Sequence, residues 1–223
     1  MKTHFKTLFA IFFLLSISIH CQVTNSQEFL NSRNITTMDL RSSGLKGDAY
    51  LNKDFMPARL SLDNTIYSMR FNAYQDEMEV EKDDKLYDLK KQPGYQITFL
   101  TTNKIYAIYN FDQDNQAKTG FFVVLFQGDK VSLLLKEKIE YFEEVKPKTG
   151  YDKYQPPKLE RVDDKFYMSR DGVTAIELPK RKKEILKLFL DKAGDVESYA
   201  KKNKLSFNKK EELAKIFAYY NSL

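Results

Sequence analysis

The chain has 223 residues and a formal net charge of +5, with 30% charged and 14% aromatic side chains but no tryptophan. Its only cysteine and both histidines (Cys21, His4 and His20) lie within residues 1–21. If that segment is removed on export, Ser-His-Asp catalysis, thiol nucleophiles, disulfides and metal sites built on imidazole or thiolate are all excluded.

Residues 1–21 have the composition of a secretory signal peptide. Lys2 and Lys6 form a basic start, residues 8–19 form an apolar run broken only by two serines, and the polar chain begins at Gln22. A run of about a dozen apolar residues is too short to span a bilayer, which needs about 20. The sequence therefore predicts an exported protein, periplasmic or associated with the cell surface, with no transmembrane segment in the mature chain.

Cys21 leaves an alternative open for the start of the mature chain. Cleavage after Cys21 would leave Gln22 at the amino terminus, whereas cleavage before it would give a lipoprotein anchored through the cysteine. The residue before a lipid-modified cysteine is normally Gly, Ala or Ser, and here it is His20. Anchoring through Cys21 is therefore the less favoured alternative.

Charge is distributed unevenly along the rest of the chain. Loss of residues 1–21 removes two lysines and no acid, so the net charge falls from +5 to +3. Residues 180–223 hold 12 Lys or Arg against 6 Asp or Glu, which leaves the preceding part slightly acidic. This division indicates a basic carboxyl-terminal segment distinct from the body. Because the chain is expected to be exported, nucleic acid is not an expected partner.

Residues 22–47 precede the body of the protein. They are polar, rich in Ser, Asn and Thr, and show no sustained period of 2 or 3.6. This composition predicts a flexible polar leader with at most one short ordered stretch. We place a β-rich domain after it, at residues 48–178.

Residues 51–145 alternate between apolar and polar side chains, which predicts β-strands with one buried face. The residues expected on buried faces are Tyr67, Met69, Phe71, Ala73, Ile105, Ala107, Tyr109, Phe111, Val131, Leu133, Leu135, Ile139 and Tyr141. In the last of these runs, the residues expected to face solvent are Ser132, Lys136, Lys138 and Glu140. Residues 121–126 are apolar throughout, as in a central strand covered on both faces.

Short turns separate the expected strands. They are Asp63-Asn64, Asp83-Asp84, Pro93-Gly94 and Gly128-Asp129. Strands joined so closely form an antiparallel meander, because parallel crossovers need a dozen or more residues. The sheet could be open, curved into a half-barrel or closed into a barrel, and the periodicity does not distinguish these forms.

The chain changes character after the meander. Residues 146–158 contain three prolines and one glycine, which predicts an irregular connection. A further hairpin is expected beyond it, with residues 165–169 and 173–178 flanking an Arg170-Asp171-Gly172 turn.

Residues 179–223 change to a helical period. The apolar stripes consist of Ile185, Leu186 and Phe189, then Val196, Tyr199 and Ala200, then Leu213, Ile216, Phe217 and Tyr220. Asn208, followed by Glu211 three residues later, predicts the amino-terminal cap of the last helix. The expected fold class is therefore α+β, a mostly antiparallel sheet followed by two or three short helices packed on it.

Few local motifs point to chemistry. Residues 112–123 begin like an EF-hand loop, but Ala117 stands where glycine is required and Val123 where a glutamate should chelate calcium, so we expect a hairpin loop. Neither a GxGxxG nor a GxxxxGK[ST] sequence occurs. We assign no catalytic, cofactor-binding or metal-ligating residue and expect no cofactor.

A hydrolase is nevertheless an alternative. Asp76, Glu77 and Glu79 lie at a strand turn and could supply the carboxylate pair of a glycoside hydrolase, which needs no histidine. A Ser-Lys pair is a second way to hydrolysis without histidine, although no local signature marks one. Both alternatives require the side chains to converge in a pocket.

Two groups of residues are candidates for binding. Tyr151 and Tyr154, in the irregular connection, could line a carbohydrate or peptide groove. Lys182 and Lys183, in the basic segment, could meet anionic lipid headgroups or an acidic polysaccharide. The plainer interpretation is that the tyrosines hold the loop to the surface and that the lysines are solvated helix faces.

Residues 48–52 (DAYLN), 67–79 (YSMRFNAYQDEME) and 217–223 (FAYYNSL) carry a resemblance to known sequences. On these segments the chain resembles a family of uncharacterised exported proteins of Gram-negative bacteria that combine a β-rich body with a short lysine-rich helical tail. The resemblance implies localisation and architecture. It implies no activity and no site residue.

These observations predict an exported, envelope-associated binding or structural module. A curved sheet covered by helices could hold a lipid or another apolar ligand, by analogy with lipoprotein carriers. The alternatives are the hydrolase and a module that docks a protein partner through its sheet edge or basic helices. Docking predicts an exposed apolar patch of more than a few hundred Å².

Overall fold

The structure, a computed structural model, describes residues 29–32, 44–149 and 153–223. The predicted signal peptide with Cys21, most of the polar leader and Tyr151 lie outside the described residues. The described part is mostly β-structure with short helices at the carboxyl end, as the sequence predicts. Within it, no helix is long and apolar enough to cross a membrane.

The elements follow one another in the order expected, strands first and helices last. The strands are β1 (Leu30–Ser32), β2 (Met56–Leu60), β3 (Ile66–Asn72), β4 (Glu77–Lys82), β5 (Lys85–Leu89), β6 (Gln96–Phe99), β7 (Lys104–Gln113), β8 (Gln116–Phe126), β9 (Ser132–Lys136), β10 (Ile139–Phe142), β11 (Lys158–Arg161), β12 (Lys165–Ser169) and β13 (Thr174–Glu177). The helices are α1 (Lys182–Lys187), a 3₁₀ turn (Leu190–Lys192), α2 (Ala193–Lys202) and α3 (Lys210–Ser222).

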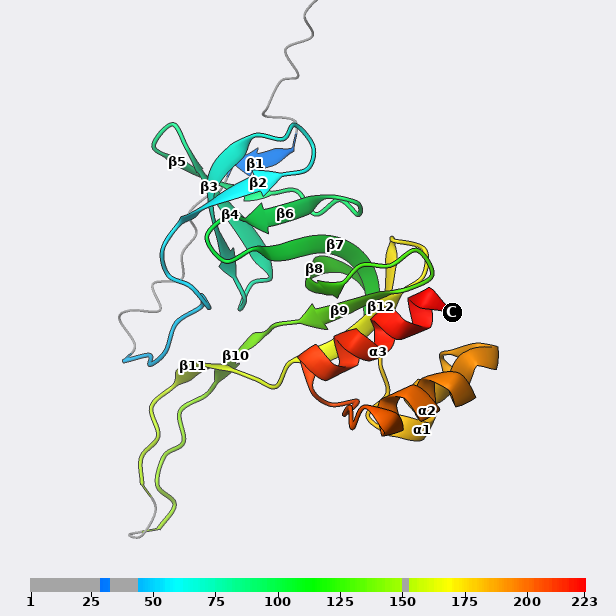
Figure 1. Cartoon of the computed structure of the whole chain (residues 1–223). Coiled ribbons are helices and arrows are strands. Elements are labelled where there is room, and N and C mark those ends of the chain that lie inside the picture. Colours follow the sequence, from blue (N-terminus) through cyan, green and yellow to red (C-terminus); the bar gives the residue numbers. More distant parts are fainter. Residues whose placement is uncertain (1–28, 33–43, 150–152) are drawn as a thin grey trace, which may run out of the picture.

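One part of the sheet is the predicted antiparallel meander (Figure 1). In this part β5, β4, β3, β2, β6 and β7 lie side by side, and β1 adds to the edge through β5. The turns at Asn64, Asp83 and Asp84 have left-handed backbone, which Asn and Asp adopt more readily than most residues. The alternating residues of β3 (Tyr67, Met69, Phe71) and the following Ala73 are buried, which confirms the predicted register.

Five strands close into a barrel. The periodicity of the sequence could not distinguish this form from an open sheet or a half-barrel. β7 pairs with β8, β8 with β9, β9 with β12 and β12 with β13, and β13 returns to β7. The closing pair is parallel, with Thr174 opposite Asn110 and Ala175 opposite Phe111. It joins segments far apart in the chain, so the local turn pattern did not predict it. The β12–β13 hairpin itself forms around Arg170-Asp171-Gly172 as predicted.

The barrel is filled and covered by three apolar clusters. Its interior holds Ala107, Tyr109, Phe111, Phe122, Leu134, Tyr167 and Ala175, which come from all five strands. The ring of Phe122 packs edge to face at 5.2 Å from the ring of Phe111 and at 4.9 Å from that of Tyr167. A second cluster lies between the meander and the barrel and includes Phe71 and Tyr106. The wall strands are therefore buried on both faces, which explains the uninterrupted apolar run at the end of β8.

The helices form the third cluster against the barrel (Figure 1). Leu213, Ile216 and Phe217 of α3 are fully buried there. Asn221 fixes the end of α3 to the β8–β9 loop, because its side chain accepts a hydrogen bond from the Lys130 N–H at 2.9 Å and donates one to the Val131 carbonyl at 3.0 Å.

The predicted cap of the last helix is wrong. α3 begins at Lys210, after Lys209, and no side chain caps it. The preceding turn is held instead by Glu212, whose carboxylate accepts a hydrogen bond from the Ser206 N–H at 2.6 Å. Glu212 therefore stabilises the backbone that precedes the helix, and Asn208 is not the cap.

β10 and β11 form a two-stranded hairpin arm that projects from the body (Figure 1). Tyr141, predicted on a buried face, is 44% exposed, because β10 has left the main sheet. The expected meander therefore ends at β9 rather than at residue 145. The connection expected to be irregular over residues 146–158 also carries pairing, since Val145 bridges Gln155 and β11 begins at Lys158.

Candidate functional site

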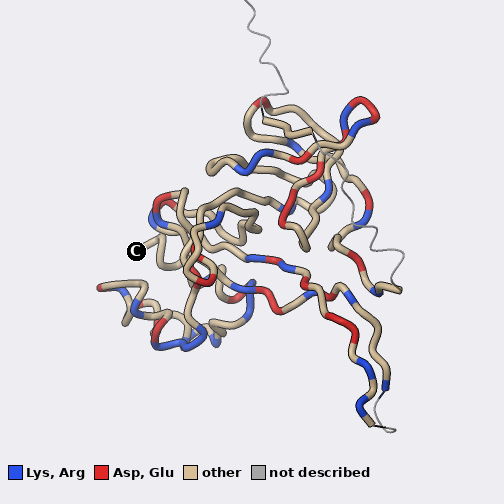
Figure 2. The backbone as a smooth tube through the Cα atoms, turned by 180° about the vertical axis from the view of Figure 1, so that it is seen from behind, with Lys and Arg blue, Asp and Glu red and all other residues tan. Residues whose placement is uncertain are grey.

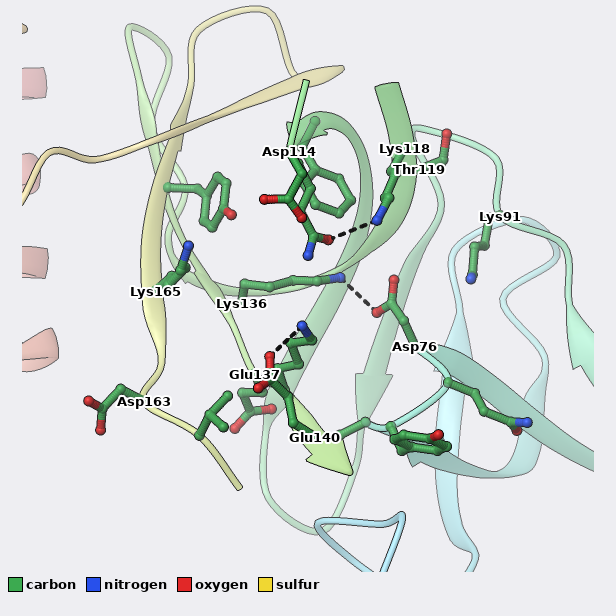
Figure 3. Close-up of a pocket in the computed structure, with 18 residues that line it drawn as sticks. Asp76, Lys91, Asp114, Lys118, Thr119, Lys136, Glu137, Glu140, Asp163 and Lys165 are labelled. Carbon is green, nitrogen blue, oxygen red and sulfur yellow. Dashed lines mark hydrogen bonds and ion pairs between the residues drawn. The ribbon is translucent and has the colours of Figure 1, made fainter. Parts of the chain in front are cut away.

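A cavity of about 690 Å³ opens at one end of the barrel. Its walls come from the β3–β4 turn, the β7–β8 hairpin, the end of β9 and the start of β12 (Figure 3). The mouth of a β-barrel is a frequent place for ligands, and the volume is within the usual range for ligand pockets of about 300–1,000 Å³. We therefore take this barrel-mouth cavity as the candidate site.

The lining combines an aromatic floor with charged walls. Phe111 and Tyr167, which also belong to the barrel interior, face the cavity. The charged residues of the walls are Asp76, Lys91, Asp114, Lys118, Lys136, Glu137, Lys138, Glu140, Asp163 and Lys165. Such a surface favours a polar ligand over an acyl chain.

Of the described lysines in the cavity wall, Lys136 is the most buried. Its Nζ donates hydrogen bonds to Asp76 Oδ1 at 2.7 Å and to the Phe121 carbonyl at 2.9 Å, and it lies over the rings of Phe111 and Phe122 at 5.0 and 4.7 Å from their centroids. The side chain is only 11% exposed. Burial lowers the pKa of the Lys136 ammonium below its usual value, and the Asp76 carboxylate opposes that shift.

The position of Lys136 corrects a prediction. We expected Ser132 and Lys136 to face solvent, yet Ser132 is 8% exposed and Lys136 points into the barrel. Strand residues two apart share a face, so Lys136 lies on the same face as Leu134, which fills the interior. The run Leu133-Leu134-Leu135 is apolar on both faces and hides this alternation.

Asp76 is held in place by the β3–β4 turn, where its backbone is left-handed with φ of 57°. Its carboxylate accepts the bond from Lys136 and a longer one from the Phe121 N–H at 3.4 Å. Gly120 on β8 lies beneath the pair, and a Cβ there would fall 2.6 Å from Lys136 Nζ and closer still to Asp76 Oδ2. Because Gly120 has no side chain, Lys136 Nζ and Asp76 Oδ2 can occupy the space next to its backbone.

The other charged groups of the cavity differ in how far they are neutralised. Lys138 is paired with Glu140 at 2.6 Å. Lys165 is paired with Glu177 at 3.1 Å. Lys118 donates to the side-chain oxygen of Gln113 at 3.3 Å, an uncharged partner. Its amine and that of Lys136 point into the same part of the cavity (Figure 3). These two lysines are the cations best placed to meet an anionic group.

Glu137 closes the neighbouring wall and is a structural residue. It is 6% exposed, and its carboxylate accepts hydrogen bonds from Lys104 at 2.6 Å, from the Tyr106 hydroxyl at 2.7 Å and from Arg161 at 3.1 Å. Burial raises the pKa of Tyr106 well above its usual value, and the adjacent Glu137 raises it further. With three donors already bound, Glu137 links the barrel to the hairpin arm.

The carboxylates considered for hydrolysis are distributed over different surroundings. Only Asp76 lines the cavity. Glu77 pairs with Lys91 at 2.9 Å, and its pKa is raised mainly by burial. Glu79 is fully buried against Arg70, with 2.7 Å between its Oε2 and the arginine Nε. In the described residues, no group of three His, Cys, Asp or Glu side chains is arranged to hold a metal ion.

The residues predicted to bind are not brought together. Tyr154 lies on the hairpin arm, is 53% exposed and donates its hydroxyl to Glu144 at 3.1 Å. Lys182 and Lys183 lie on α1, in the helical segment where Lys and Arg concentrate (Figure 2). Lys182 pairs with Glu197 at 2.8 Å and lies over the ring of Phe207. None of these three lines the barrel-mouth cavity.

Lys136, Lys118 and Gly120 were not among the residues predicted to form a site. The signal that could have found them is Gly120 itself, a glycine inside a strand of apolar residues, because such glycines often mark the close approach of another group. Fold and site together define a class: a small closed barrel with a meander on one side, helices on another, and a charged cavity at its mouth. No protein-family model, curated protein or solved structure matches the chain.

Proposed function

We propose that this chain is an exported binding module that takes a small ligand with an anionic group into the barrel-mouth cavity. The observation that carries the proposal is Lys136. An ammonium has three N–H donors, and two of them are used by Asp76 and the Phe121 carbonyl. The third is available to a ligand oxygen.

The energetic cost of this lysine supports a binding role. Removing an ammonium from water is expensive, and an apolar side chain in the same place often gives equal or greater stability. A perturbed ionisable group beside a cavity is therefore a candidate functional group. Lys118 adds a second cation that no carboxylate of the described residues neutralises through a close ion pair.

The lining of the cavity supports one of the ligand classes considered from the sequence. Its charged walls favour a polar ligand over the lipid or other apolar ligand considered from the sequence. The described lining contains lysine and threonine but no serine, so the Ser-Lys hydrolase gains no support. The composition of residues 1–21 and the resemblance to exported proteins support export.

Isothermal titration calorimetry with sodium glycolate, acetate and phosphate tests the proposal. We expect at least one of these anions to bind the wild-type chain, and we expect K136M to lose that binding. K183M is the matched control, since it removes the same charge from an exposed position of α1. If none of the anions binds, or if K136M binds as well as K183M, the proposal is wrong.

A further inference from the structure

The arrangement around Lys136 supports covalent chemistry as well as an ion pair. We propose that Lys136 forms a reversible imine with a small ligand that carries both a carbonyl and a carboxylate, such as an α-oxo acid. This inference rests on the proposed function and identifies the ligand class for the same cavity. An amine in a desolvated site is an established type of nucleophile towards carbonyl compounds.

The geometry orients the amine. A neutral lysine has two N–H donors and one lone pair, and the two acceptors around Nζ, Asp76 Oδ1 at 2.7 Å and the Phe121 carbonyl at 2.9 Å, satisfy both donors. The lone pair is then left for a ligand. Burial lowers the pKa of the ammonium and so shifts the equilibrium towards this neutral form.

Asp76 is placed to move the protons. Loss of one proton from the ammonium to solvent gives the neutral amine while Asp76 stays a carboxylate, and Nζ then forms a bond to the carbonyl carbon while the carbonyl π electrons move to oxygen. Proton transfers from nitrogen, through Asp76, make this oxygen a hydroxyl and then a leaving water. Loss of that water forms the C=N bond, so the sum is amine plus carbonyl giving imine plus water, with no change of oxidation state.

The rest of the cavity indicates the second group of the ligand. Lys118 points into the same space as Lys136, so a carboxylate next to the carbonyl could pair with it (Figure 3). Phe111 and Tyr167 form the apolar floor against which the carbon atoms of the ligand would pack. A carboxylate on the carbon next to the carbonyl would allow one ligand to meet both lysines of the cavity.

Reductive trapping tests the inference on the unmodified chain. The chain is incubated at pH 7 with glyoxylate and sodium cyanoborohydride, which reduces an imine to a stable secondary amine, and the modified lysines are identified by peptide mass spectrometry. Because a lowered pKa raises the share of neutral amine at pH 7, we expect Lys136 to be labelled faster than exposed Lys183. Labelling spread evenly over surface lysines, or absent from Lys136, overturns the inference.

Two further measurements separate this inference from the proposed function. Glycolate has the carboxylate but no carbonyl, so its binding by calorimetry reports the non-covalent site alone. If glycolate binds but glyoxylate is not trapped at Lys136, imine formation fails and the binding function stands. If glycolate, acetate and phosphate all fail to bind and glyoxylate is not trapped at Lys136, both fail. G120A keeps Lys136 but crowds its amine, and we expect selective labelling to fall to the level of Lys183 in a variant whose circular dichroism is unchanged. Undiminished labelling of G120A would contradict the placement of the reaction.

Discussion

Two of the shielded ion pairs among the described residues differ in what surrounds them. Glu79 and Arg70 pair across β3 and β4, and both the carboxylate and the guanidinium have further protein partners. The Glu79 carboxylate also accepts a hydrogen bond from the Tyr50 hydroxyl at 2.8 Å, and Arg70 donates to the Lys53 carbonyl at 3.1 Å. Arg70 is further stacked on Tyr50, 3.9 Å from its ring centroid.

Lys136 and Asp76 form the second pair, at the wall of a cavity. Asp76 is 25% exposed, and Lys136 keeps one N–H donor beyond its two protein acceptors. A saturated pair can only hold the fold together, whereas a pair with unused capacity beside a cavity can hold something else. The function of a buried charge therefore depends on the hydrogen-bond donors and acceptors that are not already bonded to other protein groups.

The largest expected effect is on the saturated pair. E79A leaves Arg70 without its carboxylate and Tyr50 without its acceptor, and breaking a buried pair from one side costs about 3–5 kcal/mol. We expect the free energy of unfolding, measured by urea denaturation, to fall by that amount. E81A, two residues further along β4 and exposed, is the control and should change it by no more than about 0.5 kcal/mol. Equal effects of the two variants would break the comparison.

G120A should affect the ion pair of Lys136 and Asp76 only by steric contact with the added methyl group. The backbone of Gly120 is not left-handed, so alanine is allowed, but its Cβ would press on Lys136 Nζ at 2.6 Å and on Phe111 Cε1 at 3.1 Å. The two shortest contacts, to Asp76 Oδ2 and Lys136 Nζ, are the ends of flexible side chains that can move aside. We therefore expect a loss of stability at the lower end of the usual cost of overpacking, about 1 kcal/mol, by urea denaturation, together with loss of anion binding. G194A is the control, because nothing lies within 4 Å of the Cβ it would add.

K136M should separate binding from stability. Methionine replaces the buried ammonium with an apolar side chain of similar length, and the remaining Asp76 is exposed enough to be hydrated. We expect stability in urea to be unchanged or higher by about 1 kcal/mol, while anion binding is lost. A loss of 3 kcal/mol or more, as in E79A, would show that Lys136 is structural and would remove the distinction between the two pairs.

The sequence predicts the meander far better than the barrel. Alternation in Tyr67, Met69 and Phe71 was sufficient for β3, because that strand has one face on the core and one towards polar residues. The pairing of β13 with β7 depends on residues more than 60 positions apart, such as Ala175 and Phe111, and no local pattern encodes it. The candidate site depends on this closure, so it could not be predicted before the fold was known.

Local period also fails where both faces of a strand are covered. Leu133, Leu134 and Leu135 face different clusters, and only the closed barrel shows that the next residue on the face of Leu134 is Lys136. The exposed Tyr141 is the opposite case, an apolar residue in register with the core whose strand leaves the sheet. In both places the side chains alternate between two faces, but the tertiary packing determines what each face contacts.

The smallest expected effect is a pH dependence that belongs to Lys136. The pKa of its ammonium is lowered in the fold by burial, which Asp76 opposes and which the charges of Lys91 and Lys138 reinforce. Between this lowered pKa and the usual value of 10.5, the unfolded chain binds a proton that the folded chain does not. The free energy of unfolding therefore rises with pH across that window, because the unfolded state binds one more proton than the folded state and a higher pH disfavours the state with more bound protons.

The difference in unfolding free energy between wild type and K136M isolates this contribution. Tyr67, whose pKa is raised to about 12 by burial and by its hydrogen bond to Asp63, loses its stabilising effect as pH rises above 10, but it does so in both proteins and cancels. We expect wild type to gain on K136M as the pH is raised towards 10.5, in urea denaturation at a series of pH values. A difference that stays constant with pH would mean that Lys136 has the same affinity for its proton in the folded and unfolded chains. The cavity pair would then be as well solvated as a surface pair, and the contrast with Arg70 and Glu79 would be one of exposure alone.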